Sequence, residues 1–221
     1  MYGGVRSGGA FDLVVLAASQ GGIAASRQVL AALPADLPAA VILLLHRTSS
    51  TPDRLPGLLA RRVRLPVGTV REGHRPRAGT VYVAPSDGQL VLDADGAFAR
   101  APLAGRLALA DPLLHSVAAA AGSRTIAAVL TGRLGDGAAG VQAVKRAGGR
   151  VLVQDQATAE HFGMPRAAIA TGCVDFVLPL GTLAPAIITL AMAPGAAAWL
   201  RVPVAPWAPP QPPPAAASLV S

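Results

Sequence analysis

Cysteine, aromatic residues and lysine are all scarce in this 221-residue chain. The single cysteine, Cys173, excludes an intramolecular disulfide framework and a cysteine-rich zinc site. Aromatic residues make up 4% of the chain, so a core has to be assembled from Ala, Val, Leu and Ile. Hydrophobic residues nevertheless reach 52%, which excludes disorder of the whole chain and is enough for one α/β domain, or at most two small ones.

Acidic residues are also few, with 12 Asp and Glu against 19 Lys and Arg, and the formal net charge is +7. Nearly all the positive charge is arginine, and its densest stretch lies between residues 61 and 77. This stretch lacks the interleaved aromatic residues of an RNA-binding sheet and the pattern of a zinc finger or basic helix. We therefore expect a solvated basic face or, second, a surface for an acidic protein partner, ahead of a nucleic-acid site.

Long uninterrupted apolar runs are absent from the sequence. The most apolar stretch, residues 183–200, is rich in Ala and is broken by Pro185, Pro194 and Gly195, so we expect no membrane insertion. The N-terminus lacks the layout of a signal peptide. These features predict a cytoplasmic protein with an N-terminal extension over residues 1–12, one domain over 13–193 and a disordered, Pro- and Ala-rich tail over 194–221.

Short apolar runs alternate with helical patterns along the chain. The predicted strands span residues 13–18, 41–45, 67–70, 80–84, 125–130, 150–154 and 174–178, and the predicted helices span 23–33, 54–62, 111–121, 136–147, 165–171 and 183–192. This alternation predicts an α/β fold with a doubly wound, mostly parallel sheet and helices on both faces. Residues 90–92 and 97–99 predict an antiparallel hairpin at one edge of that sheet.

Three of the predicted strands are followed by reactive side chains. Ser19 precedes the glycines of a strand-to-helix turn, His46 directly follows five aliphatic residues, and Asp136 lies in a glycine-rich loop. Singly, each has an ordinary structural role: a helix cap or phosphate-binding turn for Ser19, a half-buried histidine for His46, a helix cap for Asp136. Together at one sheet edge they predict the Ser-His-Asp combination of a serine hydrolase, although the Gly-x-Ser-x-Gly elbow of α/β-hydrolases is missing.

Other polar residues have simpler interpretations. Asp111 is expected to cap the helix that begins there, and Cys173 to be a small buried hydrophobe. His161 is a minor candidate for lining the cleft.

Several short motifs accompany these three residues. They are Ala18–Gly22 (A-S-Q-G-G), Leu45-His46, Gly79–Asp87 (G-T-V-Y-V-A-P-S-D), Ala110–Ala118, Leu130–Ala138 (L-T-G-R-L-G-D-G-A), Gln154-Asp155 and Phe162–Pro165 (F-G-M-P). In this order they resemble the catalytic domain of the CheB family, the chemotaxis protein-glutamate methylesterases. The resemblance covers the chain from about Leu13 to Leu190.

The resemblance implies a Rossmann-like methylesterase domain in which Ser19 is the nucleophile, His46 the general base and later acid, and Asp136 the carboxylate that holds the imidazole. It also implies hydrolysis of glutamate γ-methyl esters on the cytoplasmic helices of chemoreceptors, together with deamidation of receptor glutamines. Gln20, Gly21 and Arg133 are then the expected oxyanion and substrate contacts. The family needs no cofactor and no metal.

The sequence departs from the family pattern around the expected site. Gln20 stands where the family usually has Thr, Arg133-Leu134 replaces Met-Gly, and residues 106–110 lack the usual Arg-Pro-Ser. Two alternatives stay open: a related serine esterase with another carboxyl-ester substrate, and a non-catalytic binding module on the same fold. Only about a dozen residues precede the first strand, so we expect a stand-alone enzyme without a receiver domain, with a separate regulator protein as a candidate partner.

Overall fold

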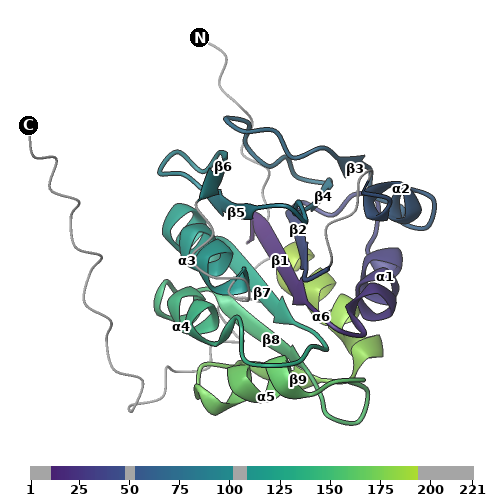
Figure 1. Cartoon of the computed structure of the whole chain (residues 1–221), viewed down its shortest axis with the longest axis vertical. Coiled ribbons are helices and arrows are strands. Elements are labelled where there is room, and N and C mark those ends of the chain that lie inside the picture. Colours follow the sequence, from purple (N-terminus) through teal and green to yellow (C-terminus); the bar gives the residue numbers. More distant parts are fainter. Residues whose placement is uncertain (1–10, 48–52, 102–108, 194–221) are drawn as a thin grey trace, which may run out of the picture.

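The computed structural model describes residues 11–47, 53–101 and 109–193 (Figure 1). Seven strands form one sheet in which every pair is parallel, in the order β3-β4-β2-β1-β7-β8-β9. Their bounds are β1 Leu13–Ala18, β2 Ala40–Leu45, β3 Val67–Gly68, β4 Val81–Val83, β7 Thr125–Val129, β8 Arg150–Gln154 and β9 Phe176–Leu178. The predicted tail over residues 194–221 and most of the segment 106–110 lie outside the described residues.

Helices cover both faces of the sheet, as the strand–helix alternation predicts (Figure 1). One face packs against α1 (Gly22–Ala32), α2 (Leu55–Ala60) and α6 (Leu180–Met192), and the other against α3 (Ala110–Ala121), α4 (Ala138–Arg146) and α5 (Gly163–Ala170). In β1 the side chains alternate, so that Leu16 lies in the first core cluster and Val15 in the second. Burial on both faces explains why these strands are continuous apolar runs.

The predicted hairpin forms a separate two-stranded sheet. Strands β5 (Gln89–Leu92) and β6 (Phe98–Ala101) pair antiparallel as a two-stranded sheet of their own, without hydrogen bonds to the seven-stranded sheet. Leu90, Leu92 and Phe98 are buried in the core cluster that α3 shares with β2 and β4. Because these apolar side chains point into that cluster, the hairpin covers part of a sheet face beside α3 and does not extend the sheet's edge.

Three helices begin two or three residues away from their predicted starts. Helix α4 begins at Ala138, so Asp136 lies in the preceding loop, α5 begins at Gly163, two residues early, and α6 begins at Leu180, three residues early. Helix α6 buries Leu183, Ile187 and Leu190 at helical spacing against the sheet. Among the helices of the described ranges, none is long and apolar enough to cross a membrane.

Helices α3 and α4 pack closely together because Gly140 faces the first of them. A Cβ atom at Gly140 would lie 2.5 Å from Leu114 Cβ, well inside van der Waals contact. Leu114 is itself fully buried, so it has no room to move aside. The glycine therefore sets the spacing of the two helices whose N-termini border the site described below.

The substitution Gly140→Ala is expected to lower the free energy of unfolding by about 1–3 kcal/mol, since overpacking has to push α3 and α4 apart. Gly57→Ala is the matched control, because Gly57 lies in α2 with no atom within 4 Å of an added Cβ. That change is expected to stabilise the protein by about 0.5–1 kcal/mol through the better helix propensity of Ala. Denaturant unfolding of both variants measures the difference, and equal effects of the same sign would contradict this picture of the α3–α4 contact.

Candidate active site

The site lies at the carboxyl edge of the sheet, where β1 has β2 on one side and β7 on the other. The chain winds outward from β1 in both directions, which makes this edge the topological switch point where open α/β sheets bind ligands. Ala18 and Leu45 are paired in register, and His46 N–H donates to Ala18 O at 3.0 Å. Ser19 and His46 therefore leave neighbouring strands at the same level.

Ser19 stands in a tight turn between β1 and α1. Gly22 N–H donates to Ser19 O at 2.9 Å, and Gly21 adopts the left-handed conformation with φ of 77°. A side chain at Gly21 would also collide with Glu160, whose Oε2 lies 2.8 Å from the position of a Cβ. Within the described residues, the amides of Gln20 and Gly21 donate no hydrogen bond, so both N–H groups are available at the start of α1.

Thr131, at the end of β7, holds this turn from behind. Its carbonyl accepts Ser19 N–H at 3.0 Å, and its hydroxyl donates to Gln20 O at 3.0 Å and accepts His161 N–H at 2.8 Å. Its own N–H donates to Oε1 of the fully buried Gln154 at 2.8 Å. Every polar group of Thr131 is thus used to fix loops around the serine, because a buried polar group without a partner is costly.

Asp136 contacts the imidazole of His46 and caps helix α3 at the same time. His46 Nε2 lies 2.8 Å from Asp136 Oδ2, and the two side chains are 19% and 5% exposed. Oδ2 also accepts the N–H groups of Leu109 and Ala110 at 2.9 and 2.7 Å, and Oδ1 accepts that of Asp111 at 3.1 Å. The carboxylate therefore sits at the positive end of α3, where backbone donors fix its position.

Asp111 performs the reciprocal task. The sequence predicts that Asp111 caps its own helix, α3. The structure shows instead that its Oδ1 accepts the N–H of Gly140, in the first turn of α4, at 2.7 Å. Burial raises the pKa of Asp111, and the nearby Asp136 carboxylate raises it further, against the lowering effect of the Gly140 hydrogen bond. Burial also opposes ionisation of Asp136, but contacts with His46 and the α3 amides lower its pKa overall.

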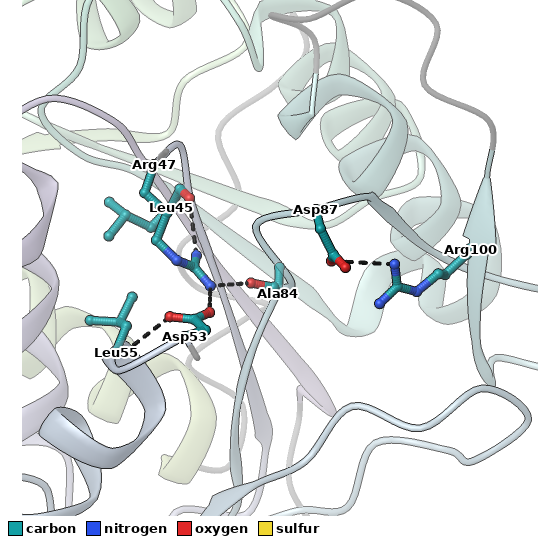
Figure 2. Close-up of polar contacts among 7 residues, drawn as sticks. All are labelled: Leu45, Arg47, Asp53, Leu55, Ala84, Asp87 and Arg100. Atoms are coloured by element: carbon teal, nitrogen blue, oxygen red, sulfur yellow. Dashed lines mark hydrogen bonds and ion pairs between the residues drawn. The ribbon is translucent and has the colours of Figure 1, made fainter. Parts of the chain in front are cut away.

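Arg47, the residue that follows His46, fixes the end of β2 through the contacts drawn in Figure 2. Its guanidinium donates to Leu45 O at 3.2 Å and to Ala84 O at 2.9 Å, and pairs with the Asp53 carboxylate. Partial burial opposes ionisation of Asp53, yet the hydrogen bonds from Arg47 and from a backbone N–H at the start of α2 lower its pKa. The arginine thus joins β2, β4 and α2 next to His46.

A cavity of about 500 Å³ opens over these groups. Ser19, His46 and Gly21 line it, together with Arg27 of α1 and the exposed side chain of Glu160. Glu160, and not the neighbouring His161, is among the lining residues; its Oε1 lies 3.4 Å from His161 Nε2. No cluster of three metal-binding side chains exists in the described ranges.

The structure brings together most of the residues expected from the sequence. Ser19, Gln20, Gly21 and His46 line one cavity, and Asp136 reaches His46 from the loop after β7. Arg133 is exposed in that same loop but does not line the cavity. Thr131, Arg27 and Glu160 were not assigned to the site from the sequence, although Thr131 lies within the Leu130–Ala138 motif.

A serine at a strand-to-helix turn, with available amides beside it and a histidine–aspartate pair on the next loops, is the arrangement of a serine-hydrolase site on a parallel α/β sheet. A family model described as CheB methylesterase matches residues 14–187. The chain belongs to the CheB methylesterase family.

Relatives of known name are similar over most of this chain. Proteins named protein-glutamate methylesterase/protein-glutamine glutaminase are 40% identical over 190 residues in Moorella thermoacetica and 42% over 187 residues in Bordetella pertussis. These alignments cover 81% and 80% of this chain but 44% and 52% of the relatives, so the chain spans about half their length. The crystal structure of the Thermotoga maritima CheB methylesterase catalytic domain superposes with a TM-score of 0.77 at 32% identity, covering 81% of this chain and 98% of that one.

Two variants of Asp136 test its contact with His46 and its capping of α3 separately. Asp136→Asn keeps one oxygen acceptor for the α3 amides, puts an NH₂ donor in place of the other and loses the charge beside His46, so we expect hydrolytic activity to fall by about 10³–10⁴-fold with a smaller loss of stability than in Asp136→Ala. Asp136→Ala also removes the cap, and the free energy of unfolding is expected to drop by about 1–3 kcal/mol at pH 7. Activity assays and denaturant unfolding of the two variants measure both effects.

The stability difference between wild type and Asp136→Ala depends on pH in one direction. Because the folded-state pKa of Asp136 lies below its ordinary value, the ionised carboxylate stabilises the fold fully above about pH 4. The difference is expected to shrink as the pH falls through the lower folded-state pKa. A difference that grew towards acid pH would show that Asp136 is not held as an anion.

Proposed function

We propose that this chain hydrolyses γ-methyl esters of glutamate side chains in chemoreceptors, with Ser19 as nucleophile, His46 as general base and acid, and Asp136 as the orienting carboxylate. The observation that carries the proposal is the contact between His46 and the capped Asp136, on a histidine that leaves its strand level with Ser19. The names of the relatives support hydrolysis of methyl esters on protein glutamates and add deamidation of protein glutamines as a second proposed reaction of the same site.

The proposed chemistry follows from this geometry. Ser19 Oγ bonds to the ester carbonyl carbon as its proton passes to His46, and the proton then leaves with methoxide as methanol. Since Nε2 of His46 faces Asp136, Nδ1 is the ring nitrogen that exchanges this proton. Water, activated by the same histidine, cleaves the acyl-serine and releases the γ-carboxylate. No metal or cofactor enters these steps.

Backbone amides are the proposed oxyanion donors. The N–H groups of Gln20 and Gly21 stand at the N-terminus of α1 beside Ser19, where the helix dipole favours a developing negative charge. The amide of Arg133 is the third candidate, because its loop packs against the serine through Gly132. The Gln20 side chain lines the same cavity and is a proposed substrate contact.

The proposed partners are the cytoplasmic helices of methyl-accepting chemoreceptors and a separate regulator protein, with no nucleic acid and no membrane insertion. We accordingly propose a cytoplasmic location. The absence of a membrane-spanning helix from the described ranges is compatible with this location.

Methanol release from methylated chemoreceptor is the direct test. Wild type is expected to release methanol, and Ser19→Ala to lose at least about 10³-fold of that rate because no other group supplies the nucleophile. Thr182→Ala is a matched control, since among the described contacts this hydroxyl donates to Pro179 O at the start of α6, and Thr182 does not line the cavity. Its activity is expected to equal that of wild type.

A fluorophosphonate probe distinguishes the alternatives. Labelling that requires Ser19, in a protein inactive on methylated receptor, would indicate a serine esterase with a different carboxyl-ester substrate; the charged Arg27 and Glu160 at the cavity favour this as the second candidate. Absence of labelling in folded wild type would refute the hydrolase and leave an anion-binding module.

A further inference from the structure

Leu134 combines two features that a leucine normally avoids. Its backbone φ is 64°, in the left-handed region, and among the described residues Leu134 is the one non-glycine residue with a positive φ. Its side chain is 64% exposed, the largest exposure among the large hydrophobic residues described. A left-handed leucine is strained, and an exposed one gains nothing from burial, so neither feature contributes to the stability of the fold.

The surroundings of Leu134 explain how the strain persists. Gly163 approaches so closely that a Cβ there would lie 2.8 Å from Leu134 N. Two residues earlier, a Cβ on Gly132 would lie 3.0 Å from Ser19 Cβ, and two residues later stands Asp136. The loop is therefore held at both ends by the proposed catalytic groups and from the side by the start of α5, which directs the Leu134 side chain outward.

Leu134 is not part of the packed core of the described residues. It belongs to neither of the two core clusters of the described residues. Nor is it among the residues that line the cavity over Ser19, so it lies to one side of the space in which the ester is expected to bind. A group that contacts Leu134 must therefore extend beyond the ester, as a protein segment does and a small ester does not.

A second exposed aliphatic residue lies in the helix that follows the serine turn. Ile23, in the first turn of α1, is 56% exposed and lines the cavity together with Ser19. Ile23 follows Ser19 by four residues, and Leu134 follows Gly132, where an added Cβ would lie 3.0 Å from Ser19 Cβ. Both residues therefore belong to segments that border the serine.

We propose that Leu134 is a specificity-determining residue that packs against an apolar side chain next to the esterified glutamate in the protein substrate, with Ile23 as the second contact. The proposal rests on the proposed methylesterase function. Binding then removes the exposed leucine from water, and this gain appears only with a polypeptide substrate. The strained backbone holds the side chain in place before the substrate arrives.

The decisive variant is Leu134→Gly, which removes the side chain and the strain together. We expect its thermal stability to equal or exceed that of wild type, while kcat/KM for methylated receptor falls about tenfold, mainly through KM. Hydrolysis of p-nitrophenyl acetate is expected to stay unchanged, because a small ester does not reach Leu134. Leu58→Ala is the control, since Leu58 is 59% exposed on α2 and should leave both substrates unaffected.

Two further variants separate side-chain contact from loop flexibility. Leu134→Asn tolerates the left-handed conformation but is polar, so it should behave like Leu134→Gly, whereas Leu134→Met keeps an apolar chain and should retain receptor activity within about threefold. Unchanged receptor kinetics in Leu134→Gly, or an equal loss on both substrates, would overturn the inference while the methylesterase function stands. Wild type that releases no methanol from receptor would instead refute the function itself.

Discussion

Helices α3 and α4 are joined by an exchange of carboxylates on which the site depends. Asp136, just before α4, accepts the first amides of α3, and Asp111, in the first turn of α3, accepts an amide of α4. The first amides of α3 thus donate to the buried Asp136, and an amide of α4 donates to the buried Asp111, because a buried carboxylate is stable only with such donors. The close helix contact at Gly140 keeps the two ends within hydrogen-bonding distance, and His46 meets a carboxylate that is already fixed by the backbone.

The remaining framework acts on the serine and histidine in the same indirect way. Thr131 uses its carbonyl, hydroxyl and amide to hold the serine turn, and Arg47 ties the end of β2 to β4 and α2. Neither is the nucleophile, base or acid of the proposed reaction. Their hydrogen bonds keep reactive groups from drifting by the fractions of an ångström to which orientation-dependent catalysis is sensitive.

The sequence predicts the fold and the meeting of Ser19 and His46 because both follow directly from strand polarity. Residues at the ends of parallel neighbouring strands lie at one edge, and apolar runs of five or six residues mark those strands clearly. Exchange of caps between α3 and α4 is not readable from sequence, since it depends on how the two helices pack, and Asp111 was therefore assigned to its own helix. The hairpin's position likewise depends on which face buries Leu90 and Phe98.

The exchanged carboxylates also make the site inseparable from the rest of the fold. Pulling α3 away from α4 would leave Asp136 and Asp111 buried without their donors and would expose helix amides that both carboxylates now satisfy. A partial opening confined to this edge is therefore unfavourable. The loop that carries Asp136 can open only when α3 and α4 separate, so the free energy of opening this loop is that of separating the two helices. The proposed orienting carboxylate is in this sense part of the packed helix pair and not of a mobile surface loop.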